Sequence, residues 1–130
     1  MSPFDRMRIG ELTERAQVTP RTVRYYESIG LIPPGKRIGY GQHYYTEETV
    51  VRLRKIDQLK NLGLSLDEIR DVIDLYFLDT SGVRPKVKVL AILRQHLAET
   101  DEKLAALGQF RADLQANIKR FERWLAENKK

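Results

Sequence analysis

The predicted fold is decided by TPRTVRYYESIGL, residues 19–31. Thr19 is of a type that caps helix N-termini, and a proline such as Pro20 suits the first helical position. Gly30 is a natural C-terminal stop, so the stretch predicts a helix from Pro20 to about Ile29. Upstream, a first helix near residues 9–16 is predicted by apolar residues at helical spacing, namely Ile9, Leu12 and Ala16. Two short helices joined by a turn of about three residues have the size of a helix-turn-helix.

The second of these helices separates polar from apolar side chains. At 3.6 residues per turn, one face carries Arg21, Arg24, Tyr25 and Ser28. The other side turns inward, with Val23, Tyr26 and Leu31. Arginine donates hydrogen bonds to guanine edges or phosphates, and a tyrosine hydroxyl binds phosphate. The outer face therefore favours DNA contact, and the alternative is an ordinary solvated amphipathic helix.

The next segment predicts a hairpin and two further helices. Glycine and tyrosine are frequent from Arg37 to Tyr45, which indicates a small hairpin that would serve as a wing. Thr46 starts a third helix that Gly63 ends, and Ser65-Leu66-Asp67-Glu68 is a capping box for a fourth. We expect the buried face of the fourth helix to include Ile69, Val72, Ile73, Tyr76 and Phe77.

The C-terminal third predicts one long helix. Asp79 to Pro85 forms a connecting loop, and more than 40 residues without proline follow it. Apolar residues then recur at a strict alternation of three and four positions, which predicts a coiled-coil seam that needs a partner helix. The seam comprises Leu90, Leu93, Leu97, Leu104, Leu107, Leu114, Ile118, Phe121 and Leu125. Only Thr100 and Arg111 interrupt it.

Composition restricts the function classes. Cysteine is absent, which excludes disulfides and thiolate metal or iron–sulfur sites, so we expect a cytoplasmic protein without a cofactor. No apolar run approaches the roughly 20 residues of a membrane helix, and the charged N-terminus predicts no export signal. Residues 1–60 hold 11 Lys or Arg against 7 Asp or Glu, a balance that permits a polyanion partner. No phosphate-cradling glycine loop or catalytic array is present, so an enzyme is not expected.

Several motifs, in order, resemble those of MerR-family transcription regulators. Besides residues 19–31, they are MRIGEL at 7–12, YTEE at 45–48, LGLSLDEI at 62–69 and, more loosely, HLAE at 96–99. The resemblance covers about residues 7–120. It implies a mainly α fold, with a winged helix-turn-helix DNA-binding domain at 7–78 and a dimerisation helix at 83–128 that pairs as an antiparallel coiled coil.

The resemblance also implies which residues contact DNA. Those of the second helix are Arg21, Thr22, Arg24 and Tyr25, and those of the wing are Arg37, Gln42 and His43. Because the third helix follows the wing, we also expect its cations Arg52 and Lys55 to contact the phosphate backbone. Family members commonly show Gly, Tyr, Arg, any residue and Tyr before the third helix, whereas this chain has Gly41-Gln42-His43-Tyr44-Tyr45. His43 thus replaces a phosphate-binding arginine, and Arg37 or Lys36 would supply the missing charge. Alternatively, His43 is a surface histidine without a contact, and the third-helix cations form a solvated face.

The resemblance implies a homodimer that bends and untwists a pseudo-palindromic promoter site. RNA polymerase would be a further partner. Metal or oxidant sensing through cysteines is excluded, which leaves the effector open. Tyr76, Phe77 and Trp124 would line a small-molecule pocket or belong to the core. Two rival functions remain, a DNA-free protein-interaction module and an architectural DNA-binding module without promoter control.

Overall fold

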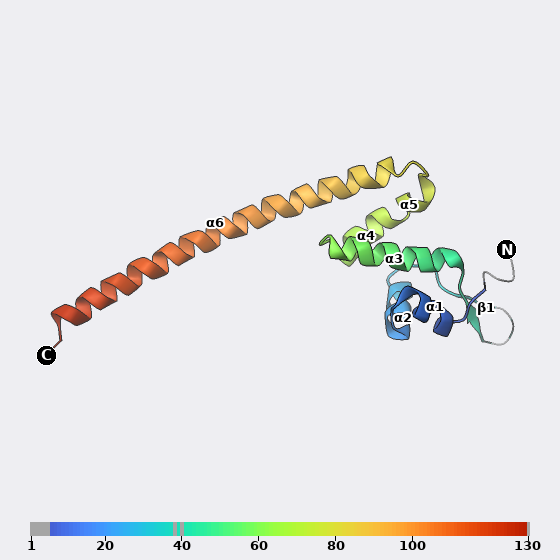
Figure 1. Ribbon diagram of the computed structural model, residues 1–130, viewed down its shortest axis with the longest axis horizontal. Coiled ribbons are helices and arrows are strands. Elements are labelled where there is room, and N and C mark those ends of the chain that lie inside the picture. The colour runs from blue at the N-terminus through green and yellow to red at the C-terminus, as the bar shows by residue number, and fades with distance from the viewer. Residues whose placement is uncertain (1–5, 38, 40, 130) are drawn as a thin grey trace. The chain divides into compact units, whose positions relative to one another are not determined.

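The computed structural model describes residues 6–37, 39 and 41–129 and is mainly helical (Figure 1). The elements, in chain order, are α1 (Ile9–Ala16), α2 (Pro20–Ser28), β1 (Lys36–Arg37), β2 (His43–Tyr44), α3 (Glu47–Asn61), α4 (Leu66–Ile73), α5 (Leu75–Leu78) and α6 (Val83–Glu127). The sequence predictions of a helix-turn-helix, a wing and one long C-terminal helix are confirmed.

The helix-turn-helix forms for the local reasons that the sequence shows. The side chain of Thr19 accepts a hydrogen bond from the backbone N–H of Thr22 at 3.1 Å, and Pro20 occupies the first turn of α2. Gly30, at φ 76°, adopts the left-handed conformation that ends the helix. Leu12 of α1 and Val23 of α2 are fully buried. The helices therefore pack through the apolar faces that their spacing predicts.

The wing is a two-stranded antiparallel hairpin that is tied to the N-terminus. Lys36 pairs with Tyr44 and Arg37 with His43, while residues 38 and 40 lie outside the described part of the chain. Met7 and Tyr45 exchange two backbone hydrogen bonds of 2.9 and 2.7 Å. Because β2 leads directly into α3, the base of the wing is fixed to the helical core.

The end of the fourth helix differs from the prediction. The capping box at Ser65 is complete, and Ile69, Val72 and Ile73 are buried. However, α4 ends at Ile73, and Tyr76 and Phe77 belong to the short helix α5, where they are only half-buried. The prediction of a buried face extending to Phe77 is therefore wrong, because α4 ends before the two rings, which pack only partly against the core and also contact cations of α3.

The connection to α6 is shorter than predicted. The loop ends at Gly82, and Pro85 lies in the first turn of α6, where a missing N–H costs no hydrogen bond. The Asp79 carboxylate accepts hydrogen bonds from the backbone N–H of Arg84 at 2.8 Å and from the hydroxyl of Ser81 at 2.7 Å. The hydroxyl of Ser81, first, and the N–H of Arg84 lower the pKa of Asp79. The Asp79 carboxylate thus accepts a hydrogen bond from a backbone N–H in the first turn of α6.

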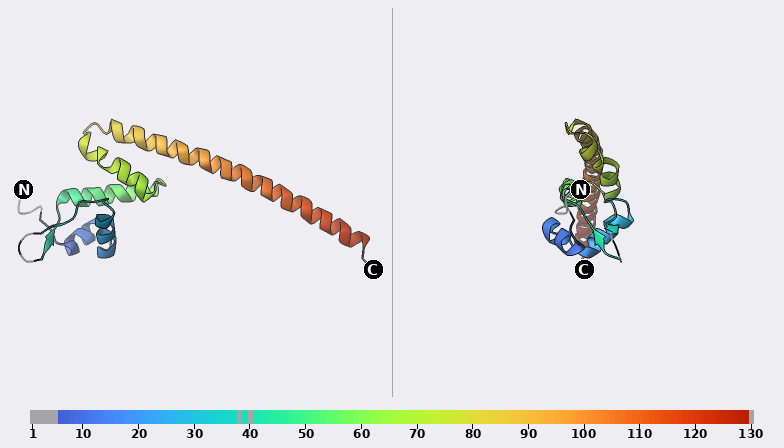
Figure 2. Two further views of the ribbon diagram at one scale, coloured as in Figure 1. Left: turned by 180° about the vertical axis from the view of Figure 1, so that it is seen from behind. Right: turned by 90° about the vertical axis from the view of Figure 1, so that its right-hand side faces the viewer.

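The chain divides into two compact units, Met1–Leu93 and Arg94–Lys130. The first turns of α6 belong to the first unit, since Pro85 and Val89 are buried and Ile92 and Leu93 pack against the core. The second unit is the rest of α6, which Figure 2 shows as one unbroken helix. Among the described residues, no helix is long and apolar enough to cross a membrane.

Candidate nucleic-acid interface

The outer face of α2 presents two arginines and a tyrosine. Arg21 and Arg24 are exposed, and the Tyr25 side chain is 52% exposed. Within the described residues, neither guanidinium makes a hydrogen bond or ion pair, so both are available to a partner. On the opposite side, Val23 and Tyr26 are buried and hold the helix in place. The face that the sequence predicts is the face that the fold exposes.

Thr22 lies at the edge of this face and has a structural role. Its hydroxyl is 3.0 Å from that of Thr19, and its backbone N–H donates to the same Thr19 oxygen. The side chain is therefore engaged in the cap of α2.

The wing contributes a second set of polar side chains. Arg37, Gln42 and His43 are exposed, and Tyr44 donates a hydrogen bond from its hydroxyl to the Gln42 side-chain oxygen at 3.0 Å. Between the wing and the helices lies a hollow of about 440 Å³, here called the wing hollow. It is lined by Arg8, Ile9, Arg24, Glu27, Gly41, Gln42, His43 and Tyr45. The hollow brings Arg24, Gln42 and His43 together and adds Arg8, which the sequence did not single out.

Tyr45 orients Glu27, which is the one carboxylate among the described residues that line the wing hollow. Its hydroxyl donates a short hydrogen bond to Glu27. Burial, first, and the hydrogen bond to Glu27 raise the pKa of Tyr45 well above its ordinary value. Tyr45 therefore stays a neutral donor. One oxygen of the Glu27 carboxylate is already hydrogen-bonded within the first unit, here called the head.

The cations of α3 face the head's own side chains. Arg52, whose side chain is 13% exposed, lies 2.8 Å from the Asp74 carboxylate and 3.6 Å from that of Glu48. Its guanidinium also covers the Phe77 ring at 4.2 Å, and the Lys55 ammonium lies 4.5 Å from the centre of the Tyr76 ring. The structure therefore engages Arg52 and Lys55 in cation–π contacts.

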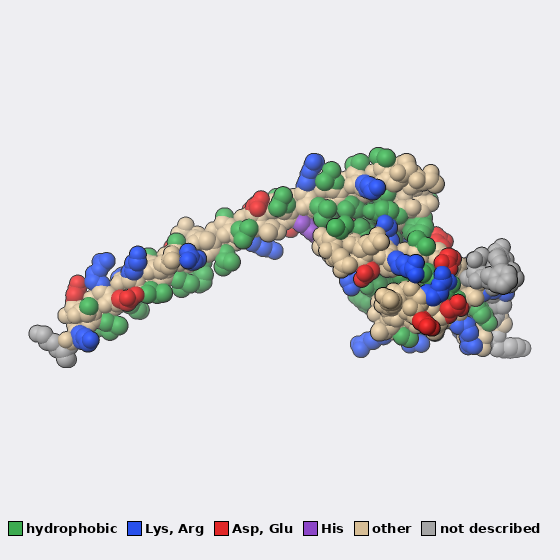
Figure 3. All heavy atoms as spheres, in the orientation of Figure 1, with side chains coloured by type: hydrophobic (Ala, Val, Ile, Leu, Met, Phe, Trp, Pro, Cys, Tyr) green, Lys and Arg blue, Asp and Glu red, His purple; other side chains and the backbone are tan. Residues whose placement is uncertain are grey.

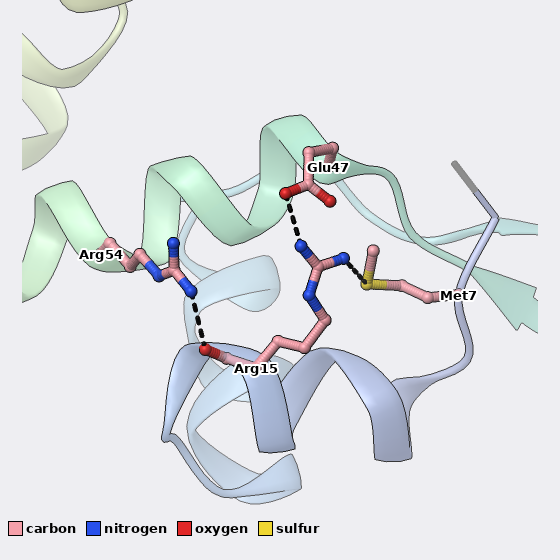
Figure 4. A network of polar contacts seen from close by, with 4 residues as sticks. All are labelled: Met7, Arg15, Glu47 and Arg54. Atoms are coloured by element: carbon pink, nitrogen blue, oxygen red, sulfur yellow. Dashed lines mark hydrogen bonds and ion pairs between the residues drawn. The ribbon is translucent and has the colours of Figure 1, made fainter. Parts of the chain in front are cut away.

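The two remaining cations of α3 are engaged as well. Lys60 donates to the Tyr26 hydroxyl at 3.5 Å. Arg54 donates to the backbone oxygen of Arg15 at 3.2 Å, and Figure 4 shows this bond beside the ion pair of Arg15 with Glu47. The hydrogen bond between their side chains raises the pKa of Arg15 and lowers that of Glu47. These contacts fix α3 against α1 and α2.

The seam of α6 is an exposed apolar stripe (Figure 3). From Leu97 to Leu125 its side chains are 45–64% exposed, whereas Leu93 is partly buried against the core of the first unit. Two exposed aromatic residues beside the stripe, Phe110 and Trp124, were not among the predicted seam residues. Each precedes a seam position by one residue, and this widens the stripe towards the C-terminal end.

Two further features concern a metal site and the aromatic residues that the sequence predicted for a pocket or the core. No group of three or more His, Asp or Glu side chains is placed to hold a metal ion within the described part of the chain. Tyr76 and Phe77 lie under the α3 cations in the first unit, and Trp124 belongs to the second.

Comparison with known proteins identifies two family models. The model "MerR HTH family regulatory protein" matches residues 7–75, and the model "MerR, DNA binding" matches residues 50–116. An uncharacterised HTH-type transcriptional regulator of Pseudomonas aeruginosa is 35% identical over 84% of this chain and 80% of its own length.

Two solved structures are also similar. The lead(II) complex of the transcription regulator PbrR691 from Ralstonia metallidurans is 34% identical with a TM-score of 0.69, covering 84% of this chain and 85% of that one. HiNmlR, a MerR family regulator bound to promoter DNA, is 20% identical with a TM-score of 0.55 over 76% of this chain and 75% of its own, and shows the fold alone.

Proposed function

Because the chain belongs to the MerR family of DNA-binding transcription regulators, we propose that it acts as a homodimer on a pseudo-palindromic promoter site. Two identical heads related by a two-fold axis read two inverted half-sites. In this proposal residues 7–78 form the DNA-binding domain and residues 83–128 the dimerisation helix. Members of this family regulate transcription rather than catalyse reactions, so the chain is not an enzyme.

The observation that carries the proposal is the exposed polar face of α2. Arg21 and Arg24 have no competing partner among the described residues, and Tyr25 is half-exposed beside them. We assign Arg21 and Arg24 to base edges and phosphates in the major groove, and the Tyr25 hydroxyl to a phosphate. Thr22 supports this face by completing the α2 cap.

The wing provides the second contact of each head. Arg37, Gln42 and His43 are exposed on the hairpin, so they are assigned to the DNA backbone beside the groove. Contacts from helix and wing favour a bent duplex, and bending a site costs roughly 1–6 kcal/mol, which additional contacts offset. Realignment of promoter elements by this bend would allow RNA polymerase to engage them.

Arg52 and Lys55 receive a different role. A phosphate contact by either would compete with its contacts to Asp74 and to the α5 rings. We therefore propose that these residues hold α3 against α5 and so position the head.

Selection from a pool of random duplexes, using the purified full chain, tests the function. We expect enrichment of an inverted repeat. Arg21→Ala and Arg24→Ala are each expected to lose about 1–3 kcal/mol of binding free energy if the side chain contacts a base edge. Arg123→Ala, on the second unit, is the matched control and retains affinity. Equal binding of selected and scrambled duplexes would contradict the regulator function and favour an architectural module, and no binding would favour a protein-interaction module.

A further inference from the structure

The wing hollow has a net charge that one histidine changes. Its charged lining comprises the guanidinium groups of Arg8 and Arg24 and the carboxylate of Glu27. For the described residues that line the hollow, the formal charge is two positive minus one negative, or +1, with a neutral His43, and +2 with a protonated His43. A single proton therefore doubles the net charge of the hollow.

Every element around the hollow contributes to the surroundings of His43. The segment before α1 supplies Arg8, α2 supplies Arg24 and Glu27, and β1 supplies Arg37, the strand partner of His43. Tyr45 adds a neutral hydroxyl that donates to Glu27. Glu27 is the only carboxylate among the described lining residues, and this hydrogen bond occupies one of its oxygens. The groups left to meet a ligand are mainly cations and donors, a set that suits an anion.

The position of His43 is fixed by the backbone beneath it. A Cβ on Gly35 would lie 2.9 Å from the Cβ of His43 and 2.9 Å from Cζ of the Tyr45 ring. The backbone at Gly35 therefore packs directly against β2. With Arg37 paired to it across the hairpin, His43 is held in the lining of the hollow.

We propose that the wing hollow binds one phosphodiester of the DNA backbone and that His43 binds it as an imidazolium, so that DNA affinity rises as pH falls from about 8 to about 6. This inference rests on the proposed function, because it requires the head to bind duplex DNA. A bound phosphate places a negative charge beside the His43 ring, and a neighbouring negative charge favours the imidazolium form. Proton uptake by His43 is thereby coupled to DNA binding.

Fluorescence anisotropy with a labelled mixed-sequence duplex tests the inference at about pH 6 and pH 8, over salt from about 50 to 200 mM. For the wild-type dimer we expect a Kd roughly 10- to 30-fold lower at the lower pH. The slope of log affinity against log salt should also steepen by about 2, since each of two phosphate contacts adds about 0.9. A merely structural role for His43 would leave this slope unchanged.

Three variants separate the contributions. His43→Gln should lose both the pH dependence and the change in slope, whereas His43→Arg should bind tightly with the steeper slope at both pH values. His96→Gln, at the chain's only other histidine, is the matched control and should behave as the wild type.

Two results would overturn the inference in distinguishable ways. Duplex binding by the wild type that does not change with pH, or that changes equally in His43→Gln, would remove the role of His43 and leave the proposed function intact. No duplex binding at either pH, with helical content retained, would remove the phosphate site together with the proposed function.

Discussion

Shortening a leucine side chain at the centre of the seam should weaken the dimer. The loss should be proportional to the exposed area of that side chain that the partner helix buries. Leu104 and Leu107 are 62% and 63% exposed. Leucine to alanine removes three carbons, worth about 2.4 kcal/mol when burial is complete. Because about 60% of each side chain remains to be buried, one substitution should cost about 1.5 kcal/mol per protomer and about 3 kcal/mol per dimer.

A loss of that size should raise the dimer dissociation constant about 100-fold for Leu104→Ala or Leu107→Ala, since about 1.4 kcal/mol corresponds to a factor of ten. Sedimentation equilibrium over a range of protein concentrations measures the constant directly. Leu62→Ala removes the same atoms from a head residue that is 54% exposed, and it should leave the constant unchanged. A dissociation constant unaffected by the two seam substitutions would refute the assignment of α6 as the dimer interface.

The seam also predicts the register of an antiparallel pair. The polar interruptions at Thr100 and Arg111 are best placed opposite each other, so that every facing pair of residue numbers has the same sum as these two and the other pairs are apolar. These pairs include Leu90 with Phe121, Leu97 with Leu114 and Leu104 with Leu107 of the partner. The two-fold axis then lies between Ala105 and Ala106, where small side chains allow close approach.

Because the chain lacks cysteine, disulfide cross-linking reads the register without background. Leu104→Cys chains mixed with Leu107→Cys chains should form a cross-linked heterodimer on air oxidation. Failure of this pair, together with ready cross-linking between Leu104→Cys and Leu114→Cys, would show that the helices pair in a different register.

Three further outcomes follow from contacts within the head. Arg52→Gln removes the Asp74 ion pair and the contact with Phe77; it should lower the free energy of unfolding by about 1–2 kcal/mol in a denaturant titration, and an unchanged midpoint would contradict the role. Gly35→Ala should weaken DNA binding without loss of helix, because its Cβ meets β2 at 2.9 Å, whereas Gly10→Ala, with open space around it, should not. The pKa of Asp79 is lowered in the folded protein, so the stabilisation by its carboxylate is present above the unfolded pKa of about 3.9 and is lost as pH falls through the folded pKa. Asp79→Ala should therefore lower the Tm at neutral pH and approach the Tm of the wild type in acid. A difference in Tm that stays constant at all pH values would contradict this role.

Local signals in the sequence predicted most of the fold. The Thr19 cap, the stop at Gly30 and the capping box at Ser65 each act within a few residues, and each forms as expected. The spacing of Val23 and Tyr26 likewise predicted which side of α2 is buried. These features depend on short-range backbone chemistry, which a single sequence displays.

The prediction failed where a local signal is ambiguous or where the cause lies far along the chain. Asp79 accepts the N–H of Arg84 and so permits α6 to begin at Val83, but an aspartate before Thr80, Ser81 and Gly82 reads equally well as part of a loop. Arg8 joins the wing hollow only because Met7 pairs with Tyr45. Neither pairing leaves a periodic signal in the sequence.

The cations of the head illustrate the same limit for the site. The sequence assigns Arg21, Arg24, Arg52 and Lys55 to DNA, because residue type alone does not distinguish a free cation from an engaged one. The fold separates them. Arg52 donates a hydrogen bond to Asp74, which lies 22 positions further along the chain, whereas the α2 arginines make no hydrogen bond or ion pair among the described residues. Loss of a free arginine should therefore reduce DNA affinity at constant stability, and loss of Arg52 should reduce stability first.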